Sequence, residues 1–303
     1  MDLSIVVPTY NGSAMLPRLL QSIRLADHPD AYEIFICDDG SSDDIASVVG
    51  LHGRGLPVHV LRQARWGARR GAARNMGIQA SKGRIVLFLD DDVAFSRQLL
   101  MAHLRSHKET SMKRLVFGFR HRVSLEPPDS SLSVVPAIND HRPYWIGRMG
   151  ERLSESPTPW YYAATCNLSV CRLGADMLFD ESFIGWGCED IEFGYRCWRA
   201  GIELHCNPEA MVVHLDQDCL EDPYINRRRG KPANFTSVIV NTVRILEKFP
   251  EDLLLQTRLR ETLTGFTIAN GECVADPLAT DVDGLIAWCR ERIEEQRATM
   301  GGT

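Results

Sequence analysis

The hydrophobic pattern is clearest where five apolar residues, Ile85–Leu89, run directly into three carboxylates, Asp90, Asp91 and Asp92. A continuous apolar run of this length, with Gly83 before it and charge after it, predicts a short strand buried on both faces. The acids then lie at the carboxyl end of the strand, which is where ligands bind in an open α/β sheet. Because adjacent carboxylates repel one another, the cluster indicates a divalent cation held by oxygen ligands. A solvated strand end, or a helix cap through Asp92, is the alternative.

Apolar runs with the length of strands alternate with segments of helical periodicity over the first hundred residues. The strands are predicted at 3–7, 32–37, 58–61 and 85–89, and the helices at 16–23, 45–49 and 72–80. Such alternation predicts a parallel sheet with right-handed crossovers. The carboxyl ends of parallel strands share one edge. We therefore expect the turn after the first strand, Asp38-Asp39 after the second and the triple aspartate to lie at the same edge.

The pattern weakens after Val93. A helix is predicted at 99–107 and a strand at 115–119, whereas 124–159 is rich in Pro, Ser and Arg and is more typical of a functional loop or insertion. The remaining elements are strands at 161–170 and 211–214, helices at 191–200 and 237–249, and a mostly helical tail at 253–298. Together they predict an α/β fold with a mostly parallel, Rossmann-like sheet flanked by helices, followed by a helical C-terminal extension.

Composition and charge exclude several classes of protein. The 303 residues are 44% hydrophobic and 24% charged, as in an ordinary soluble globular protein. A net charge of −6 argues against general nucleic-acid binding. No apolar run approaches the roughly 18 residues of a transmembrane helix, and the N-terminus lacks the basic segment of a signal peptide. Nine cysteines without a CxxC pair indicate reduced thiols in a cytoplasmic protein, with peripheral attachment to a membrane left open.

Two motifs in the first half could serve a nucleotide. Asp38 and Asp39 end a predicted strand, where a carboxylate can accept from a pyrimidine N–H or from ribose hydroxyls, although the same sequence is also a good turn. Gly71 to Gly77 reads G-x-x-R-N-x-G at the start of a predicted helix. Glycine lets backbone approach a ligand, a helix N-terminus attracts phosphate, and Arg74 adds a bidentate donor. A capped surface helix is the alternative.

Three features of the second half could serve catalysis. Glu189 and Asp190 follow a Gly-Trp-Gly turn at a predicted helix start, where one carboxylate could act as a general base and the helix dipole would keep both ionised. Trp186 offers an apolar face to a sugar ring, although a tryptophan is more often in the core. His214 ends a short strand and could join carboxylates around a Mn²⁺-like ion if the triple aspartate lies nearby. The basic run 227–231 is either solvated or a lid over a diphosphate.

Taken in this order, the motifs resemble the family 2 glycosyltransferases of the GT-A fold. The resemblance covers about residues 3 to 215. It rests on the strand opening Val6–Asn11, the turn Asp38–Ser41, the Gly71–Gly77 segment, the D-x-D element Asp90–Asp92, and Gly185–Asp190 with His214 after it. The last stretch is similar to the W-G-x-E-D segment of galactosyl- and N-acetylgalactosaminyltransferase-like members.

The resemblance implies a nucleotide-binding half at residues 1–110. In that half Pro8, Tyr10 and Asp39 would hold the nucleobase, and Arg74 would approach the diphosphate.

The triple aspartate is divided by the same resemblance. Asp90 or Asp91 would contact the ribose, and Asp92 would bind a metal ion, Mn²⁺ or Mg²⁺, with His214 as a further ligand.

The acceptor and catalytic half is expected at 111–235, which completes a GT-A domain of residues 1–235, and the helical extension at 236–303. The resemblance makes Asp190 the general base of an inverting transfer, with Glu189 and Trp186 positioning sugar and acceptor. Retaining relatives share the W-G-x-E stretch, and the adjacent Asp190 favours inversion.

The predicted function is therefore metal-dependent, inverting transfer of a sugar from a nucleotide-sugar, a UDP-hexose or UDP-N-acetylhexosamine, to an acceptor hydroxyl. The acceptor is a carbohydrate, a lipid-linked glycan, a small molecule or a peptide. One alternative is a nucleotidyltransferase, which would carry a Gly-rich basic loop where this chain has Pro-Thr-Tyr-Asn. The other is an inactive nucleotide-sugar-binding module, which the intact acids disfavour. The sequence leaves open the donor sugar, the acceptor, the oligomeric state, the choice between inversion and retention, and the roles of 120–160 and of the C-terminal extension.

Overall fold

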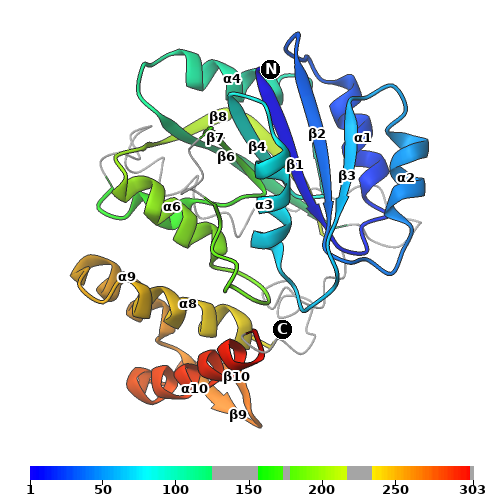
Figure 1. Cartoon of the computed structure of the whole chain (residues 1–303). Helices are drawn as coiled ribbons and strands as arrows, with labels where there is room; N and C mark the ends of the chain where they lie inside the picture. Colours follow the sequence, from blue (N-terminus) through cyan, green and yellow to red (C-terminus); the bar gives the residue numbers. More distant parts are fainter. Residues whose placement is uncertain (125–155, 173–177, 217–233, 301–303) are drawn as a thin grey trace. The chain divides into compact units, whose positions relative to one another are not determined.

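The computed structural model describes residues 1–124, 156–172, 178–216 and 234–300 (Figure 1). The chain divides into two compact units. Unit 1 comprises Met1–Phe179 and Phe193–Gln217, and unit 2 comprises Asp180–Glu192 and Asp218–Thr303. The basic run 227–231 and most of the Pro- and Ser-rich segment lie outside the described residues. The predicted functional boundary at residue 235 stays a prediction; by packing, residues 180–192 group with the C-terminal helices.

The first half of unit 1 is the predicted alternation of strands and helices. Four parallel strands lie in the order β3-β2-β1-β4. The strands are β1 (Leu3–Thr9), β2 (Tyr32–Asp38), β3 (Val58–Arg62) and β4 (Ile85–Leu89). The helices between them are α1 (Leu16–Leu25), α2 (Ile45–His52) and α3 (Arg70–Ala80). The continuous apolar run 85–89 is confirmed as a strand in which every residue is buried.

The second half of the sheet is mixed rather than parallel. Beyond β4 the order continues β7-β6-β8-β5, with only the β6–β8 pairing parallel. These strands are β7 (Asn167–Cys171), β6 (Arg114–Ser124), β8 (Glu203–Asp216) and β5 (Val93–Phe95). Helix α4 (Leu99–Lys108), the 3₁₀ turn η2 (Pro159–Tyr162) and α6 (Glu189–Arg199) complete the described elements. The chain after Asp92 thus forms a short strand, not a capped helix.

Alternate residues of β1 face opposite layers of helices, as the period of a strand requires. Leu3, Ile5 and Val7 pack with apolar residues of α1, α2 and α4 in one core cluster. Val6 faces α3, where a Cβ on Gly77 would lie 2.4 Å from its Cγ1. Gly77 therefore lets α3 lie directly on the sheet. The expectation that this glycine brings backbone close to a ligand is replaced by a packing role.

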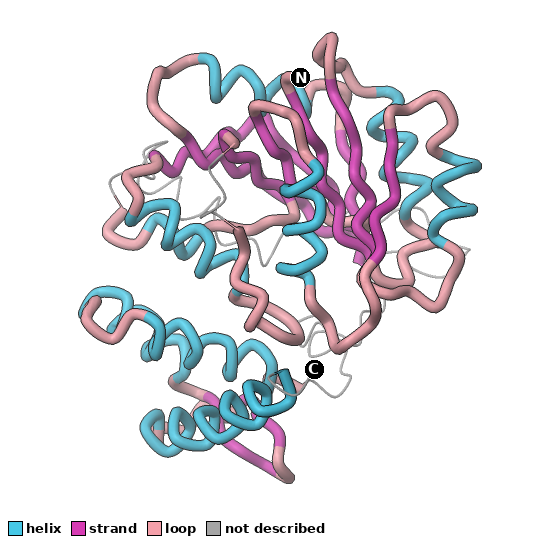
Figure 2. Tube along the Cα trace, viewed as in Figure 1, coloured by secondary structure: helices cyan, strands magenta, loops and turns pink. Residues whose placement is uncertain are grey.

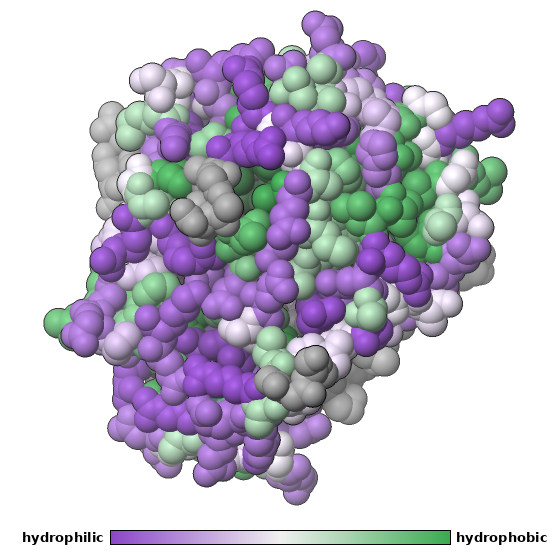
Figure 3. All heavy atoms as spheres, viewed as in Figure 1, coloured by the Kyte–Doolittle hydropathy of each residue, from purple (hydrophilic) through white to green (hydrophobic). Residues whose placement is uncertain are grey.

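Most of the face seen in Figure 3 is hydrophilic, with hydrophobic atoms visible near the edge strand β3. Val60 of this strand is 36% exposed, whereas no residue of β1 within Leu3–Val7 exceeds 0%. The difference reflects position in the sheet, since β3 has a neighbour on one side only.

A bulge sets where the second half of β8 pairs with β6. The register between these strands shifts around Gly118, where a Cβ would lie 1.8 Å from the carbonyl oxygen of Ala210. The Asn167 side chain closes the bulge because its Nδ2 donates to Phe119 O (3.1 Å) and to Ala210 O (2.9 Å). After the bulge β8 resumes regular pairing and carries His214 toward the edge of the sheet.

A buried polar chain holds the Asn167 amide in place. Its nitrogen donates to two carbonyls, so its oxygen must accept, and His103 Nε2 donates to it at 2.8 Å. His103 Nδ1 then accepts from Ser169 Oγ (2.8 Å), which accepts from His107 Nε2 (2.8 Å). Burial lowers the pKa of His103 to about 4 and that of His107 to about 3. Both imidazoles are therefore neutral at physiological pH.

Unit 2 contains α8 (Thr236–Lys248), α9 (Leu253–Leu263), the hairpin β9 (Phe266–Ala269) and β10 (Glu272–Ala275), and α10 (Val282–Met300) (Figure 2). The tail was predicted to be mostly helical, and the structure adds this hairpin to its helices. Its turn is Asn270-Gly271, with φ of 53° and 78°. Positive φ at both turn residues matches the twist of a hairpin, and Asn-Gly is a strong sequence signal for it.

The bulge gives a prediction about glycine. We expect Gly118→Ala to lower the free energy of unfolding by about 1–3 kcal/mol or more, because the added methyl meets backbone. Gly50 in α2 is the matched control: a Cβ there meets nothing within 4 Å, so Gly50→Ala should be neutral or stabilising by up to about 1 kcal/mol. Urea unfolding followed by circular dichroism measures both. Equal stability of the two variants would contradict the account of the bulge.

The buried histidines predict acid sensitivity. An unfolded histidine binds a proton near pH 6.5, whereas folded His103 does so only near pH 4, so unfolding takes up a proton between these values. Stability should therefore fall as the pH drops from about 6.5 to 4, by up to about 1.4 kcal/mol per pH unit for each such group. His103→Gln keeps a donor for Asn167 and removes the titration, so its stability should depend less on pH. Unfolding free energies with identical pH slopes in wild type and variant would refute this.

Candidate functional site

The ends of three adjacent parallel strands form one edge, as predicted. Thr9 at the end of β1 lies opposite Asp38 at the end of β2, and Val6 lies opposite Phe88 of β4. Tyr10, Asp39 and the triple aspartate follow these strand ends directly in the chain. The topology of the sheet therefore gathers the polar residues that the sequence had placed after three separate strands.

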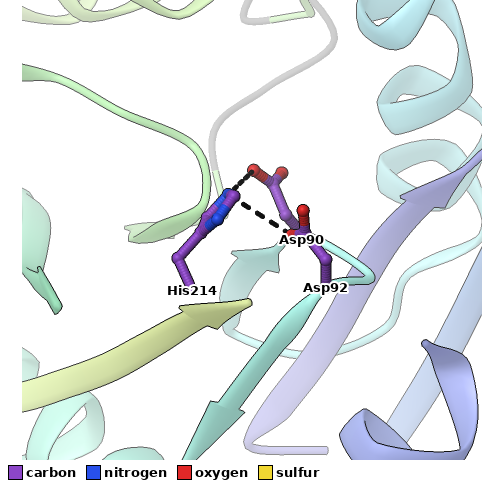
Figure 4. Close-up of side chains that lie close together, drawn as sticks. All are labelled: Asp90, Asp92 and His214. Carbon is purple, nitrogen blue, oxygen red and sulfur yellow. Dashed lines mark ion pairs between the residues drawn. The ribbon is translucent and has the colours of Figure 1, made fainter. Parts of the chain in front are cut away.

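Asp90, Asp92 and His214 come together at this edge (Figure 4). One ligand atom from each lies within 4.8 Å of the others. His214 Nε2 is 3.3 Å from Asp92 Oδ1 and 3.9 Å from Asp90 Oδ2. The antiparallel pairing of β5 with β8 produces this proximity, because it sets His214 opposite Val93 and lets Leu215 N donate to Asp92 O at 2.8 Å.

The chemistry of this group fits a divalent cation. Two carboxylates and one imidazole suit Mn²⁺ and related ions, and a cation between the carboxylates would remove their mutual repulsion. Among the described residues it is the one cluster of three or more such side chains with this spacing. The prediction had set Asp90 on the nucleotide side, and the structure brings it beside Asp92 and His214.

Asp91 is turned into the fold. Thr9 Oγ1 donates to Asp91 Oδ2 at 2.5 Å, and a Cβ on Gly12 would lie 2.1 Å from the same oxygen. Burial, together with the negative charge of Asp92, raises the pKa of Asp91 to about 7. Asp91 therefore braces the loop after β1, a contact that the sequence did not reveal. Its predicted role at the ribose stays a prediction.

The nucleobase residues of the prediction lie around a basic loop. The carboxylate of Asp39 accepts from Gln63 Nε2 (2.6 Å), Arg65 Nη1 (2.9 Å) and the backbone N–H of Arg69 (2.8 Å). The Arg65 guanidinium stacks on the ring of Tyr10, 3.5 Å from its centroid. Arg65 thus joins Tyr10 to Asp39. Neither Gln63 nor Arg65 was singled out from the sequence, although the density of arginine after β3 was a signal.

Pro8 is buried within β1 opposite Cys37, so it shapes the strand from which Tyr10 follows. Tyr10 itself is 41% exposed, although the Arg65 guanidinium lies over its ring.

The G-x-x-R-N-x-G segment proves to be largely structural. Arg74 is 2% exposed, and its Nη2 lies 3.4 Å from Asp90 Oδ1. The neighbouring Asn75 exchanges two hydrogen bonds with the backbone of Phe179, at 2.9 and 2.8 Å. Arg74 thus contacts Asp90, one of the three side chains of the candidate metal group Asp90, Asp92 and His214. Its approach to a diphosphate stays a prediction.

Glu189 and Asp190 begin helix α6, as predicted, and belong to unit 2. Asp190 Oδ1 accepts from the backbone N–H of Ile191 at 2.9 Å, and Glu189 is 7% exposed. Carboxylates in the first turn of a helix are stabilised in their ionised form by the helix dipole. Trp186 of the preceding turn is half-buried.

A model of the family described as Glycosyl transferase family 2 matches residues 4–166, more than half of the chain. The chain belongs to glycosyltransferase family 2. The family is one of glycosyltransferases, so the match disfavours the nucleotidyltransferase alternative. Among its described residues, no helix combines the length and the apolarity needed to cross a bilayer.

Curated relatives of this glycosyltransferase include validoxylamine A glucosyltransferase of Streptomyces hygroscopicus subsp. limoneus, 30% identical over 270 residues. That match covers 82% of this chain and 57% of the relative. Hyaluronan synthase of Pasteurella multocida is 28% identical over 255 residues, which are 76% of this chain and 26% of the synthase. The chain therefore spans under two thirds of the length of these relatives.

Solved structures show that the glycosyltransferase has the GT-A fold. S. aureus TarS 1–349 in complex with UDP-GlcNAc superposes with a TM-score of 0.59 at 16% identity, covering 87% of this chain and 71% of TarS. The mannosyltransferase PcManGT from Pyrobaculum calidifontis, in complex with GDP-Man and Mn²⁺, has a TM-score of 0.60 at 15% identity. That match covers 98% of this chain and 75% of PcManGT.

The different contacts of Asp91 and Asp92 can be tested with Mn²⁺ alone. We expect Asp92→Asn and His214→Ala to weaken Mn²⁺ binding at least 10-fold, because the first removes the negative charge of a carboxylate and the second removes an imidazole nitrogen. Asp91→Asn is the matched control from the same cluster and should bind Mn²⁺ within threefold of wild type. Titration followed by electron paramagnetic resonance measures the dissociation constants. Equal losses at positions 91 and 92 would contradict the assignment.

Proposed function

We propose that the protein is a metal-dependent, inverting glycosyltransferase that transfers a sugar from a UDP-hexose or UDP-N-acetylhexosamine to an acceptor hydroxyl. The observation that carries the proposal is the group of Asp90, Asp92 and His214 at the edge where three parallel strands end. Its donor set is suited to a divalent cation. Further support comes from structural neighbours that hold UDP-GlcNAc, or GDP-Man with Mn²⁺.

Asp90, Asp92 and His214 would hold the cation, and Arg74 would keep Asp90 oriented toward it. When bound, a divalent cation neutralises negative charge that develops on the departing nucleoside diphosphate. Tyr10 would stack against the nucleobase.

Asp39 would accept a hydrogen bond from a ring N–H of the base. In the structure its oxygens are held by Gln63, Arg65 and Arg69. Arg65 also covers the ring of Tyr10, so donor binding requires this guanidinium to move or to stack on the base itself.

Asp190 would accept the proton of the acceptor hydroxyl as it attacks the anomeric carbon. A base that works on the face opposite the leaving group produces inversion. Glu189 and Trp186 would position acceptor and sugar. The position of the acids at the start of α6 supports this role, because the helix dipole keeps a carboxylate ionised and able to accept a proton.

The curated relatives indicate which donor and which acceptor to test first. The curated relatives include a glucosyltransferase and glycan synthases, and they make UDP-glucose the first donor to test and a carbohydrate hydroxyl the first acceptor.

The general base can be tested without knowing the acceptor, because water can replace it. We expect the wild type with Mn²⁺ to hydrolyse a UDP-sugar slowly and to release the inverted anomer, read by NMR before mutarotation. Asp190→Asn should lower the turnover at least 100-fold, which is within the range for loss of a general base, and leave UDP binding unchanged. Glu181→Gln, an exposed acid of the same unit, is the control.

Three results would contradict the proposal: hydrolysis undiminished in Asp190→Asn, release of the retained anomer, or preference for GDP-mannose over every UDP-sugar tested. A preference for GDP-mannose would change only the proposed nucleotide of the donor.

A further inference from the structure

The turn before the proposed base is conformationally strained. Gly185, Gly187 and Cys188 have φ of 84°, 93° and 75°. Glycine accepts such values readily, whereas a cysteine does not. The other non-glycine residues with positive φ in the described chain are both asparagines, Asn11 and Asn270, which tolerate this region. Cys188 stands directly before Glu189. Strain of this kind persists only where the surroundings impose it.

Helix α8 supplies those surroundings within unit 2. Asn241 Nδ2 donates to the carbonyl of Ile184 (3.1 Å) and to that of Gly187 (2.9 Å). These carbonyls lie on either side of the Gly-Trp turn, so one buried amide holds both ends of it. Asn241 is 1% exposed, which leaves water little access to compete for these bonds.

The side chain of Cys188 is held by the same helix. Its Sγ donates to Val238 O at 3.5 Å and lies 3.4 Å from Thr242 Oγ1. Burial raises the pKa of the thiol to about 12, so Cys188 stays a protonated donor and is no nucleophile.

The backbone of the turn rests on α8. A Cβ on Gly185 would lie 2.6 Å from Ser237 Oγ, and one on Gly187 would lie 3.2 Å from Val238 Cγ2. Glycine at 185 is therefore required by its φ and by the close approach to the helix.

The far end of α8 ties both ends of the segment 180–192 together. Lys248 Nζ lies 2.6 Å from Asp180 Oδ2 and 2.6 Å from Glu192 Oε1. Glu192 is fully buried, whereas the side chain of Lys248 is 33% exposed, so solvent reaches only the lysine end of this ion pair. Between the two contact regions, Arg244 lies over the ring of Phe183, with 5.9 Å from Cζ to the centroid.

These contacts come from one face of α8. Residues 237, 241, 244 and 248 are spaced four, three and four apart, which aligns them along a helix. We call Ser237, Asn241, Arg244 and Lys248 the α8 stripe. The rest of unit 2 supports it: Arg244 Nη2 donates to Gln296 of α10, and Cys273 of the hairpin donates its N–H to Thr236 Oγ1 at 2.9 Å.

We propose that unit 2 positions the general base, and that the α8 stripe acts mainly through Asn241, which holds the strained turn so that α6 begins at Glu189 with Asp190 in its first turn. The inference rests on the proposed role of Asp190. It gives the C-terminal unit a task in the reaction, and it makes Asn241 a positioning residue that touches neither donor nor metal.

Loss of the two hydrogen bonds from Asn241 to the turn should lower the turnover rate and leave donor binding unchanged. Without Asn241, the turn can relax the strain at Cys188, and the chain that leads into Asp190 changes direction. A displacement of a catalytic group by about 1 Å can lower the reaction rate by about 100-fold. We therefore expect Asn241→Ala to lower kcat at least 10-fold, with the KM for the UDP-sugar and the Kd for Mn²⁺ within twofold of wild type.

A stability-matched control separates positioning from general weakening. Leu259→Ala removes a buried side chain of α9, 2% exposed, that belongs to unit 2 and lies outside both the turn and the α8 stripe. It should lower the melting temperature at least as much as Asn241→Ala and leave kcat within twofold. Hydrogen exchange gives a readout independent of activity: Asn241→Ala should speed exchange of the amides at 184–190 at least 10-fold, and Leu259→Ala should not.

A second variant addresses the strain itself. Glycine adopts the φ of Cys188 without penalty, so Cys188→Gly combined with Asn241→Ala should recover at least threefold of the lost kcat relative to Asn241→Ala alone.

The outcomes are distinguishable when Asp190→Asn is assayed in parallel. If Asp190→Asn is inactive while Asn241→Ala keeps full kcat and unchanged exchange at 184–190, the base stands and the positioning proposal is wrong. If Asp190→Asn keeps wild-type kcat, the proposed function fails and the positioning proposal fails with it. If Leu259→Ala loses kcat as strongly as Asn241→Ala, the effect is general destabilisation and the proposal is overturned.

Discussion

The electrostatic repulsion of three consecutive carboxylates is the constraint on which the site depends. The chain meets it by giving each acid a different partner. Arg74 approaches Asp90, Thr9 donates to Asp91, and His214 lies next to Asp92. The strand β4 is buried and paired on both sides, by β1 and by β7. The three acids that follow it are therefore held close to neighbouring elements, which supply a different partner for each acid.

The partners of the three acids come from three different elements of the fold. Thr9 comes from the adjacent parallel strand, Arg74 from the helix that Gly77 allows to lie on the sheet, and His214 from β8. The bulge at Gly118 sets the register in which His214 arrives. Packing far from the site therefore determines which two carboxylates lie near the imidazole of His214. This set of side chains in turn determines what kind of ion the edge can bind.

The sequence predicted the parallel half of the fold well because its signals are local. Continuous apolar runs identify buried strands, and their order fixes the shared edge. The partition of the acids could not be predicted, since it depends on Thr9 and Gly12 meeting Asp91 from eighty residues away. Nor could the mixed half of the sheet, where the pairing of β7 with β4 follows from tertiary packing. The β9–β10 hairpin is different, because its turn Asn270-Gly271 is itself a local signal in the sequence.

The proposed reaction uses residues from both units of the chain. The metal group belongs to unit 1, whereas the proposed base stands at the end of a strained turn held by α8 in unit 2. In this view the C-terminal helices are part of the catalytic apparatus. The storage of strain beside a functional residue, imposed by buried polar contacts, is a recurrent way to hold a side chain in one orientation.

In the proposed enzyme, the edge of the sheet holds a divalent cation that also contacts the diphosphate of a nucleotide-sugar. Pulsed electron paramagnetic resonance of Mn²⁺ bound to the protein in the presence of UDP tests it most directly. The account predicts two couplings in one complex: a directly bound ¹⁴N that disappears in His214→Ala, and ³¹P from the nucleotide. A spectrum with phosphorus coupling and no nitrogen coupling, or a nitrogen coupling that survives in His214→Ala, would contradict it.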